Sequence, residues 1–303
     1  MAWAWTALVA ALLPIAVATV RALGRGWLPI GDNAIFAIRA RDVLSFDPPL
    51  LGTWTSASLS TGGALNNPGP LLFDLLAVPT ATADGGIAVG VALLNGLAVI
   101  GIVLFAARRG GVLAAAGAAA TAAALCWAMG SELLFDPWQP HSLLLPFLLL
   151  LVLVWSTTCG DLVALPLALA VASFVLQTHL TYAVLMPVLV TWAAVGLVLE
   201  LRRRRRRHPD SWPALRRRVL RSVAVTAVVL VACWAQPVFE QVTSDGDGNL
   251  TRLARSLSDP PEQVIGAGLG VRLLTSVTTF PPWWFRSSFG NAFLPPGSAR
   301  SAG

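Results

Sequence analysis

Long apolar runs separated by short polar segments dominate the pattern of this chain. A helix needs about 20 apolar residues to cross roughly 30 Å of hydrocarbon, and runs of Leu, Ala and Val near this length recur over most of the sequence. The pattern predicts about seven transmembrane helices, over residues 3–23, 86–107, 112–130, 142–158, 162–178, 182–201 and 219–236. The first run lacks a basic stretch before it and a clear cleavage site after it, so we expect it to be retained as a helix.

Two shorter segments predict helices that do not cross. Residues 70–83 are apolar but interrupted by Asp74 and Pro79, which indicates a half-crossing or an interfacial helix. Within residues 24–69, apolar side chains recur at spacings of four, seven and eight, in Phe36, Ala40, Val43 and Leu44. That spacing predicts an amphipathic juxtamembrane helix, with Asp32 at its N-terminus.

Composition excludes a soluble domain. Of the 303 residues, 56% are hydrophobic and 12% are charged, against roughly 25% charged in ordinary globular domains. Mean hydropathy is +0.71. We therefore predict an all-α polytopic transmembrane bundle over residues 1–242, followed by an outer tail over residues 243–303. The abrupt ending of that tail after Pro295 and Pro296 predicts that the natural polypeptide continues or that this one is truncated.

The net charge of +6 is concentrated beside apolar spans, in six consecutive Arg residues at 202–207 and three at 216–218. Short loops rich in Arg face the cytoplasm, so residues 202–218 predict a cytoplasmic basic loop and a cytoplasmic N-terminus in the plasma (inner) membrane. Such clusters meet anionic headgroups, and we expect no nucleic-acid partner. Alternating spans then place residues 24–69, 131–141, 177–181 and everything after 237 on the outer side.

Polar side chains that could carry chemistry gather in these outer segments. Asp32, Arg39 and Arg41 belong to the first loop, and His179 belongs to a tight turn. The second loop contains Glu132, Asp136, Trp138, Gln139 and His141. Polar groups at a membrane boundary are costly unless partnered, which favours function. Structural roles are the alternative: an Asp N-cap, Arg side chains that reach the headgroups, an interfacial Trp and a His that joins helices.

This layout resembles the GT-C superfamily, most of all the multi-spanning actinobacterial proteins related to protein-mannosyl, aminoarabinose and arabinofuranosyl transferases. The resemblance rests on Gly31-Asp32-Asn33 in the first outer loop, on Asp136, Trp138 and Pro140 in the second, and on a later His. It implies that Asp32 acts as the base or organises the acceptor. Several members carry paired acidic residues where this chain has Asp32 followed by Asn33, and this departure weakens the case for a divalent metal cofactor.

The resemblance implies transfer of a hexosyl or pentosyl group from a polyprenyl-phosphate sugar to a glycan, lipid or protein acceptor of the envelope. Asp32 would be the catalytic base, and Arg39 or Arg41 would hold the departing phosphate, because Arg binds phosphate through paired donors. Trp138, His141 and His179 would line the sugar or acceptor pocket. A transporter or flippase of lipid-linked sugars, or a non-catalytic scaffold of envelope assembly, is the alternative, since the same polar clusters could bind without reacting.

Overall fold

The computed structural model describes residues 2–56, 58, 64–258 and 266–279. Within these ranges the regular elements are helices, apart from one isolated antiparallel bridge between Trp54 and Asn66. The predicted all-α fold is confirmed. The chain divides into two units, Met1–Ala254 and Arg255–Gly303, which are described separately.

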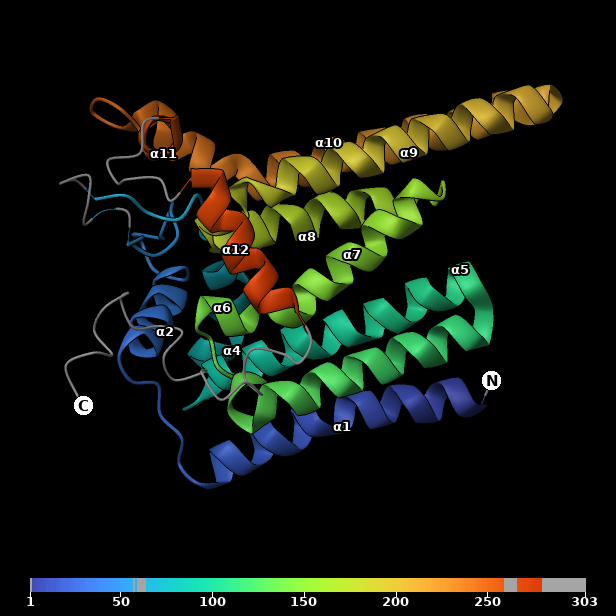
Figure 1. Cartoon of the computed structure of the whole chain (residues 1–303). Coiled ribbons are helices and arrows are strands. Elements are labelled where there is room, and N and C mark those ends of the chain that lie inside the picture. The colour runs from blue at the N-terminus through green and yellow to red at the C-terminus, as the bar shows by residue number, and fades with distance from the viewer. Residues whose placement is uncertain (1, 57, 59–63, 259–265, 280–303) are drawn as a thin grey trace. The chain divides into compact units, whose positions relative to one another are not determined.

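Six long helices form the body of the first unit in its described residues. Each sequence range that was predicted to cross the membrane coincides with one of these helices or with one half of a kinked helix. The six helices are α1 (Ala2–Gly24), α5 (Gly86–Leu133), α7 (Leu144–Thr158), α8 (Ala164–Thr178), α9 (Leu185–Arg207) and α10 (Trp212–Thr243). Helix α5 supplies two legs because it folds back at Gly110 and Gly111 (Figure 1), where φ is −131° and 65°. The 15-residue α7 and α8 are joined by a tight turn at Cys159–Asp161.

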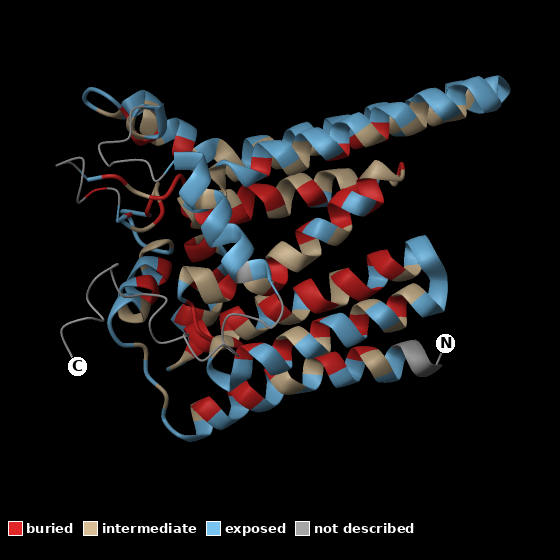
Figure 2. Ribbon diagram, viewed as in Figure 1, coloured by how far each residue is buried: buried red, intermediate tan, exposed pale blue. Residues whose placement is uncertain are grey.

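Among the residues that the structure describes, five segments are long and apolar enough to cross a membrane: Trp5–Gly24, Gly86–Leu133, Gln139–Thr158, Leu180–Arg207 and Pro209–Thr243. Helices α9 and α10 expose large apolar side chains along their length, including Val188 and Trp192 of α9 and Val228 and Val231 of α10. Figure 2 shows the pale exposed surface of these two helices. Exposed apolar surface on this scale is typical of a face that meets lipid, which indicates a membrane protein.

One end of the bundle, here called the basic end, is fixed by arginine side chains. Arg108 forms an ion pair with Asp161, with Nε 3.2 Å from Oδ2, and Arg204 Nη2 donates to the carbonyl of Cys159 at 3.2 Å. Ser222 Oγ donates to the carbonyl of Leu162 at 2.6 Å. The α5 kink, the α7–α8 turn and the α9–α10 turn are therefore gathered at the same end.

The opposite end, here called the polar end, contains residues 24–56, 58, 64–70, 131–143, 178–184 and 237–254. Helix α2 (Asp32–Asp42) confirms the predicted helix of the first loop, and it buries Phe36, Ala37 and Ala40. Its N-cap is Gly31 and Asp32 is its first residue, so Asp32 is not the capping residue that the sequence suggested. Glycine fits there because φ is 57°.

Helix α4 (Leu71–Thr82) packs against α2. Residues at the start and at the finish of α4 both contact residues of the polar end. The Phe36 and Phe73 rings lie 6.3 Å apart, and Arg41 Nε donates to the carbonyl of Thr80 at 3.4 Å. Before its start, the Gly69 amide donates to the carbonyl of Gln177 at 3.5 Å. Helix α4 is thus a 12-residue apolar helix, shorter than the roughly 20 residues that a full crossing needs.

Small side chains bring α1 and α5 close together. Ala11, Ala18, Ala115, Ala119 and Ala122 are buried in the same core cluster. Alanine at such positions lets helix backbones approach and gain dispersion contacts, which replace the hydrophobic driving force that lipid removes.

The first unit extends to Ala254, past the predicted start of the tail at residue 243. Within it α11 (Asn249–Ser258) is tied back to the first loop, with Asn249 Nδ2 donating to the carbonyl of Asn66 at 3.0 Å. The second unit contains α12 (Gly266–Thr278). Residues 259–265 and 280–303, including Pro295 and Pro296, lie outside the described residues.

Candidate functional site

The connection between α5 and α6 (Gln139–Ser142) contains Asp136. The last turn of α5 is redirected at Gly130, where φ is 74° and ψ is 176°. The amide of Asp136 then donates to the carbonyl of Glu132 at 3.1 Å, and the amide of Trp138 donates to Asp136 Oδ1 at 3.3 Å. These bonds fix the Asp136 carboxylate at the polar end.

Asn33, Asp136, Trp138 and His141 form a contiguous group, here called the Asp136 cluster. Asn33 Nδ2 donates to Asp136 Oδ1 at 2.6 Å, and His141 Nδ1 lies 2.5 Å from Asp136 Oδ2. The Trp138 ring meets the His141 ring edge-on with centroids 4.7 Å apart. The structure thus joins two of the predicted pocket residues, Trp138 and His141, to the residue that follows Asp32.

The carboxylate decides which nitrogen of His141 carries the proton. An ionised carboxylate only accepts hydrogen bonds, so we assign the proton to Nδ1, which donates to Asp136. In the neutral ring Nε2 is then an acceptor. The His141 side chain is 24% exposed and that of Asp136 is 11% exposed, so the ring remains reachable while its partner is shielded. A carboxylate that orients an accessible imidazole can bind or deprotonate a hydroxyl group.

Asp32 lies beside this cluster along the chain and is exposed. Its side chain forms no hydrogen bond or ion pair with another residue in the described part of the chain, and it lies in the first turn of α2, where the partial positive charge of the helix end favours a carboxylate. The carboxylate is therefore free to contact a substrate.

The two arginines of α2 differ. Both are exposed, but Arg41 Nε donates to the carbonyl of Thr80 and joins α2 to α4. Of the two, Arg39 is the freer to hold an anionic group.

His179 lies at the start of the α8–α9 turn, and the structure gives it local partners. Its Nδ1 accepts from the amide of Thr181 at 3.3 Å, and its ring meets that of Tyr182 edge-on at 6.4 Å. Burial lowers the pKa of the His179 imidazole below its ordinary value of 6.5. Among the described contacts, none joins His179 to the Asp136 cluster directly.

The sequence did not indicate that Asn67 joins several segments of the polar end. Its Nδ2 donates to the Thr53 carbonyl at 3.1 Å, and its Oδ1 accepts from the amide of Leu180 at 2.8 Å. Gln139 Nε2 also donates to Thr53 Oγ1 at 2.5 Å and to the carbonyl of Thr178 at 2.8 Å. The first loop, the second loop and the α8–α9 turn are thus bound into one network. The only signal in the sequence was the polar pair Asn66-Asn67 before Pro68.

The residues present do not form a ready metal site. Within the described ranges there is no group of three or more His, Cys, Asp and Glu side chains placed to hold a metal ion. Both oxygens of Asp136 already accept hydrogen bonds, and Asn33 offers its amide nitrogen to one of them. We therefore derive no chemical step through a metal.

Comparison of the chain with protein-family models, with curated proteins and with solved structures finds no match. The GT-C resemblance consequently rests on the residues quoted for it above.

Proposed function

We propose that this protein is a GT-C-type membrane glycosyltransferase that moves a sugar from a polyprenyl-phosphate donor to an envelope acceptor. One observation carries the proposal: the Asn33–Asp136 hydrogen bond holds the start of α2, and with it the exposed Asp32, beside a carboxylate-oriented His141. An available carboxylate next to an oriented imidazole suits the deprotonation and positioning of an acceptor hydroxyl.

The reaction is a displacement at the anomeric carbon. The acceptor oxygen forms a bond to this carbon, the bond from the carbon to the donor phosphate oxygen breaks, and its electron pair leaves with the polyprenyl phosphate. Asp32 takes the acceptor proton, and the configuration at the carbon inverts. Arg39 stabilises the negative charge of the departing phosphate, with Arg41 as the second candidate.

The Asp136 cluster binds the sugar or the acceptor and forms no bond to the anomeric carbon. His141 Nε2 accepts a hydrogen bond from a sugar or acceptor hydroxyl, and the exposed Trp138 offers an apolar ring face to the sugar. In this proposal His179 also lines the sugar or acceptor pocket, because it follows Thr178, whose carbonyl accepts a hydrogen bond from Gln139.

The proposed function also requires one orientation of the protein in the membrane. The basic end, with nine arginines in residues 202–218, faces the cytoplasm, and the polar end faces outward. A donor with a long hydrocarbon tail stays in the bilayer, which explains why its enzyme carries apolar helices.

Asp32→Asn is the deciding substitution. It removes the proton acceptor while it keeps a side chain of similar size, and we expect transfer to fall by roughly 10²- to 10⁴-fold, the range for a positioned acid or base. Loss of the favourable carboxylate at the helix start should cost at most about 1 kcal/mol, so expression and thermal stability stay near wild type. The assay measures release of polyprenyl phosphate from a labelled polyprenyl-phosphate sugar in membranes.

Asp47→Asn is the matched control, because Asp47 is an exposed carboxylate of the same loop outside the cluster. It should transfer sugar like wild type. Full transfer by the Asp32→Asn variant would remove Asp32 from the mechanism. Movement of labelled donor across the membrane without release of polyprenyl phosphate would instead identify a flippase.

A further inference from the structure

A line of exposed side chains runs the length of α1 and changes character at one end. Residues spaced by four lie along one ridge of a helix, with a slow drift around the axis. On α1 this ridge is apolar and exposed, at Trp5, Val9, Leu13 and Val17. The same spacing continues into Arg21 and Arg25. The ridge therefore joins a hydrocarbon-like surface to two guanidinium groups at the polar end.

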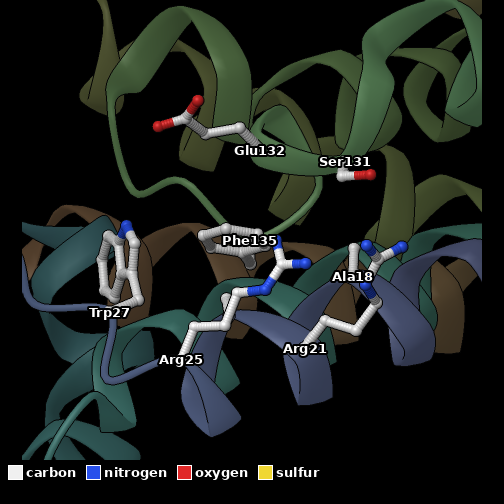
Figure 3. Close-up of a pocket in the computed structure, with 8 residues that line it drawn as sticks. Ala18, Arg21, Arg25, Trp27, Ser131, Glu132 and Phe135 are labelled. Carbon is white, nitrogen blue, oxygen red and sulfur yellow. The ribbon is translucent and has the colours of Figure 1, made fainter.

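The two arginines line a pocket of about 360 Å³ between the end of α1 and the end of α5 (Figure 3). Its apolar part contains Ala22, Trp27 and Phe135. The Trp27 and Phe135 rings meet edge-on, with centroids 5.5 Å apart and planes at 80°. Small and aromatic side chains and charged groups thus line the same pocket.

The chain after α1 is held tightly enough to give this pocket a fixed form. The Trp27 amide donates to the carbonyl of Ala22 at 3.0 Å, and the Gly26 amide donates to the carbonyl of Leu23 at 3.0 Å. Gly26 has a φ of 71°, which is typical of the residue that ends a helix. Arg25 and Trp27 are therefore positioned by the backbone of the helix end.

The pocket has unneutralised positive charge. Neither Arg21 nor Arg25 takes part in an ion pair among the described residues, although Glu132 lines the same pocket. Figure 3 shows the Glu132 carboxylate directed away from the two guanidinium groups. Guanidinium groups present several donors that match the oxygens of a phosphate. The site is thus suited to an anion that arrives from outside the protein.

We propose that this pocket binds the phosphate headgroup of an anionic membrane lipid, with the lipid's hydrocarbon chains along the Trp5–Val17 ridge of α1. The ridge favours a lipid over free phosphate, because only an amphiphile contacts both the arginines and the apolar surface below them. The inference does not depend on the proposed sugar transfer, since neither arginine belongs to the Asp136 cluster or to α2.

The test uses delipidated protein in an uncharged detergent and measures binding isotherms for three probes: dioctanoyl phosphatidic acid, dioctanoyl phosphatidylcholine and inorganic phosphate. Wild type should bind the phosphatidic acid at least about 10-fold more tightly than the phosphatidylcholine, because two guanidinium groups attract the net negative headgroup. It should also bind the phosphatidic acid more tightly than inorganic phosphate, because only the lipid contacts the apolar ridge. The double variant Arg21→Gln with Arg25→Gln should lose the preference over phosphatidylcholine.

Two further variants separate the pocket from general charge effects. The double variant Arg216→Gln with Arg217→Gln removes the same charge at the basic end and should keep the preference. Glu132→Gln removes the one acidic group that lines the pocket and should strengthen phosphatidic acid binding by several-fold.

Each outcome bears on the proposal. Unchanged preference in the Arg21 and Arg25 double variant would overturn the pocket, as would loss of preference in the Arg216 and Arg217 variant. Inorganic phosphate binding as tightly as the phosphatidic acid would overturn the role of the apolar ridge and leave an anion site only. A Glu132→Gln variant with weaker binding would contradict the electrostatic account.

Discussion

Asn33 donates a hydrogen bond of 2.6 Å to Asp136, although the two residues lie 103 positions apart in the chain. This bond explains in physical terms why an amide suits position 33. Asp136 accepts through both of its oxygens, so its neighbours must be donors. A carboxylate at position 33 would have no proton to offer and would face a like charge.

Asn33→Asp should therefore destabilise the polar end. Replacing a donor by an acceptor against a buried carboxylate leaves an unsatisfied charged group, which we expect to cost about 1–3 kcal/mol. The measurement is thermal unfolding of purified protein in detergent at pH 7. Asn66→Asp, at a half-buried asparagine of the same loop that bonds through its backbone, is the comparison and should cost less. Equal stability of the Asn33→Asp variant and wild type would contradict the bond.

The Arg108–Asp161 pair predicts a stability that depends on acid pH. Burial alone raises the pKa of the Asp161 carboxyl, but hydrogen bonds from Arg108 and from the Val163 amide, with the Arg108 charge, outweigh it and hold the pKa below 3.8. A lowered pKa means that the ionised carboxylate stabilises the fold above the unfolded-state pKa, and that this contribution is lost as the pH falls through the lower folded-state pKa. Wild type should exceed Asp161→Asn in melting temperature above pH 4, and the difference should shrink below that pH. A constant difference down to pH 2.5 would argue against ionisation as its source.

Gly86 allows α4 and α5 to meet. A Cβ at this position would overlap the carbonyl oxygen of Pro79, which is backbone and cannot move aside like a side chain. Gly86→Ala should therefore destabilise the protein by about 1–3 kcal/mol, as overpacking does. Gly117→Ala is the matched control, since an added Cβ there meets no atom within 4 Å. Thermal unfolding of both variants should show a loss for the first and none for the second.

The orientation of the bundle can be tested with single cysteines. In a Cys159→Ser background, Ser211→Cys places a thiol in the exposed α9–α10 turn at the basic end, and Ser45→Cys places one after α2 at the polar end. An impermeant thiol reagent on intact cells should label the Ser45→Cys variant and spare the Ser211→Cys variant until the membrane is opened. The reverse pattern would invert the proposed topology.

The helices were predictable because their signal is local. Each of the apolar ranges predicted to cross coincides with a helix or helical leg, and Phe36, Ala37 and Ala40 show that the spacing in the first loop identified a buried face. The kink at Gly110 and Gly111 was also readable, since two glycines beside Arg108 and Arg109 ended one apolar run and began another. Hydrophobic period and chain-breaking residues are properties of a short window of sequence.

The contacts of the candidate site were less predictable because they join distant segments. Nothing local in Asn67 or Gln139 indicates that both reach Thr53, and no spacing links Asn33 to Asp136. Helix α4 illustrates the same limit: its composition predicted a short helix, but not the bond from Arg41 to the carbonyl of Thr80 that joins it to α2. The sequence predicted Asp32 at the start of the helix in the first loop, and Asp32 is the first residue of α2. The N-cap that precedes it is Gly31, whose φ is positive.

The Asn67 network has a consequence for the order in which the chain is made. Residues 24–70 leave the ribosome long before Gln139, Leu180 and Asn249, which supply partners to Thr53, Asn67 and Asn66. The network therefore cannot close before residues as late as Asn249 have been synthesised. The earliest residues of the polar end thus depend for their hydrogen bonds on segments made much later.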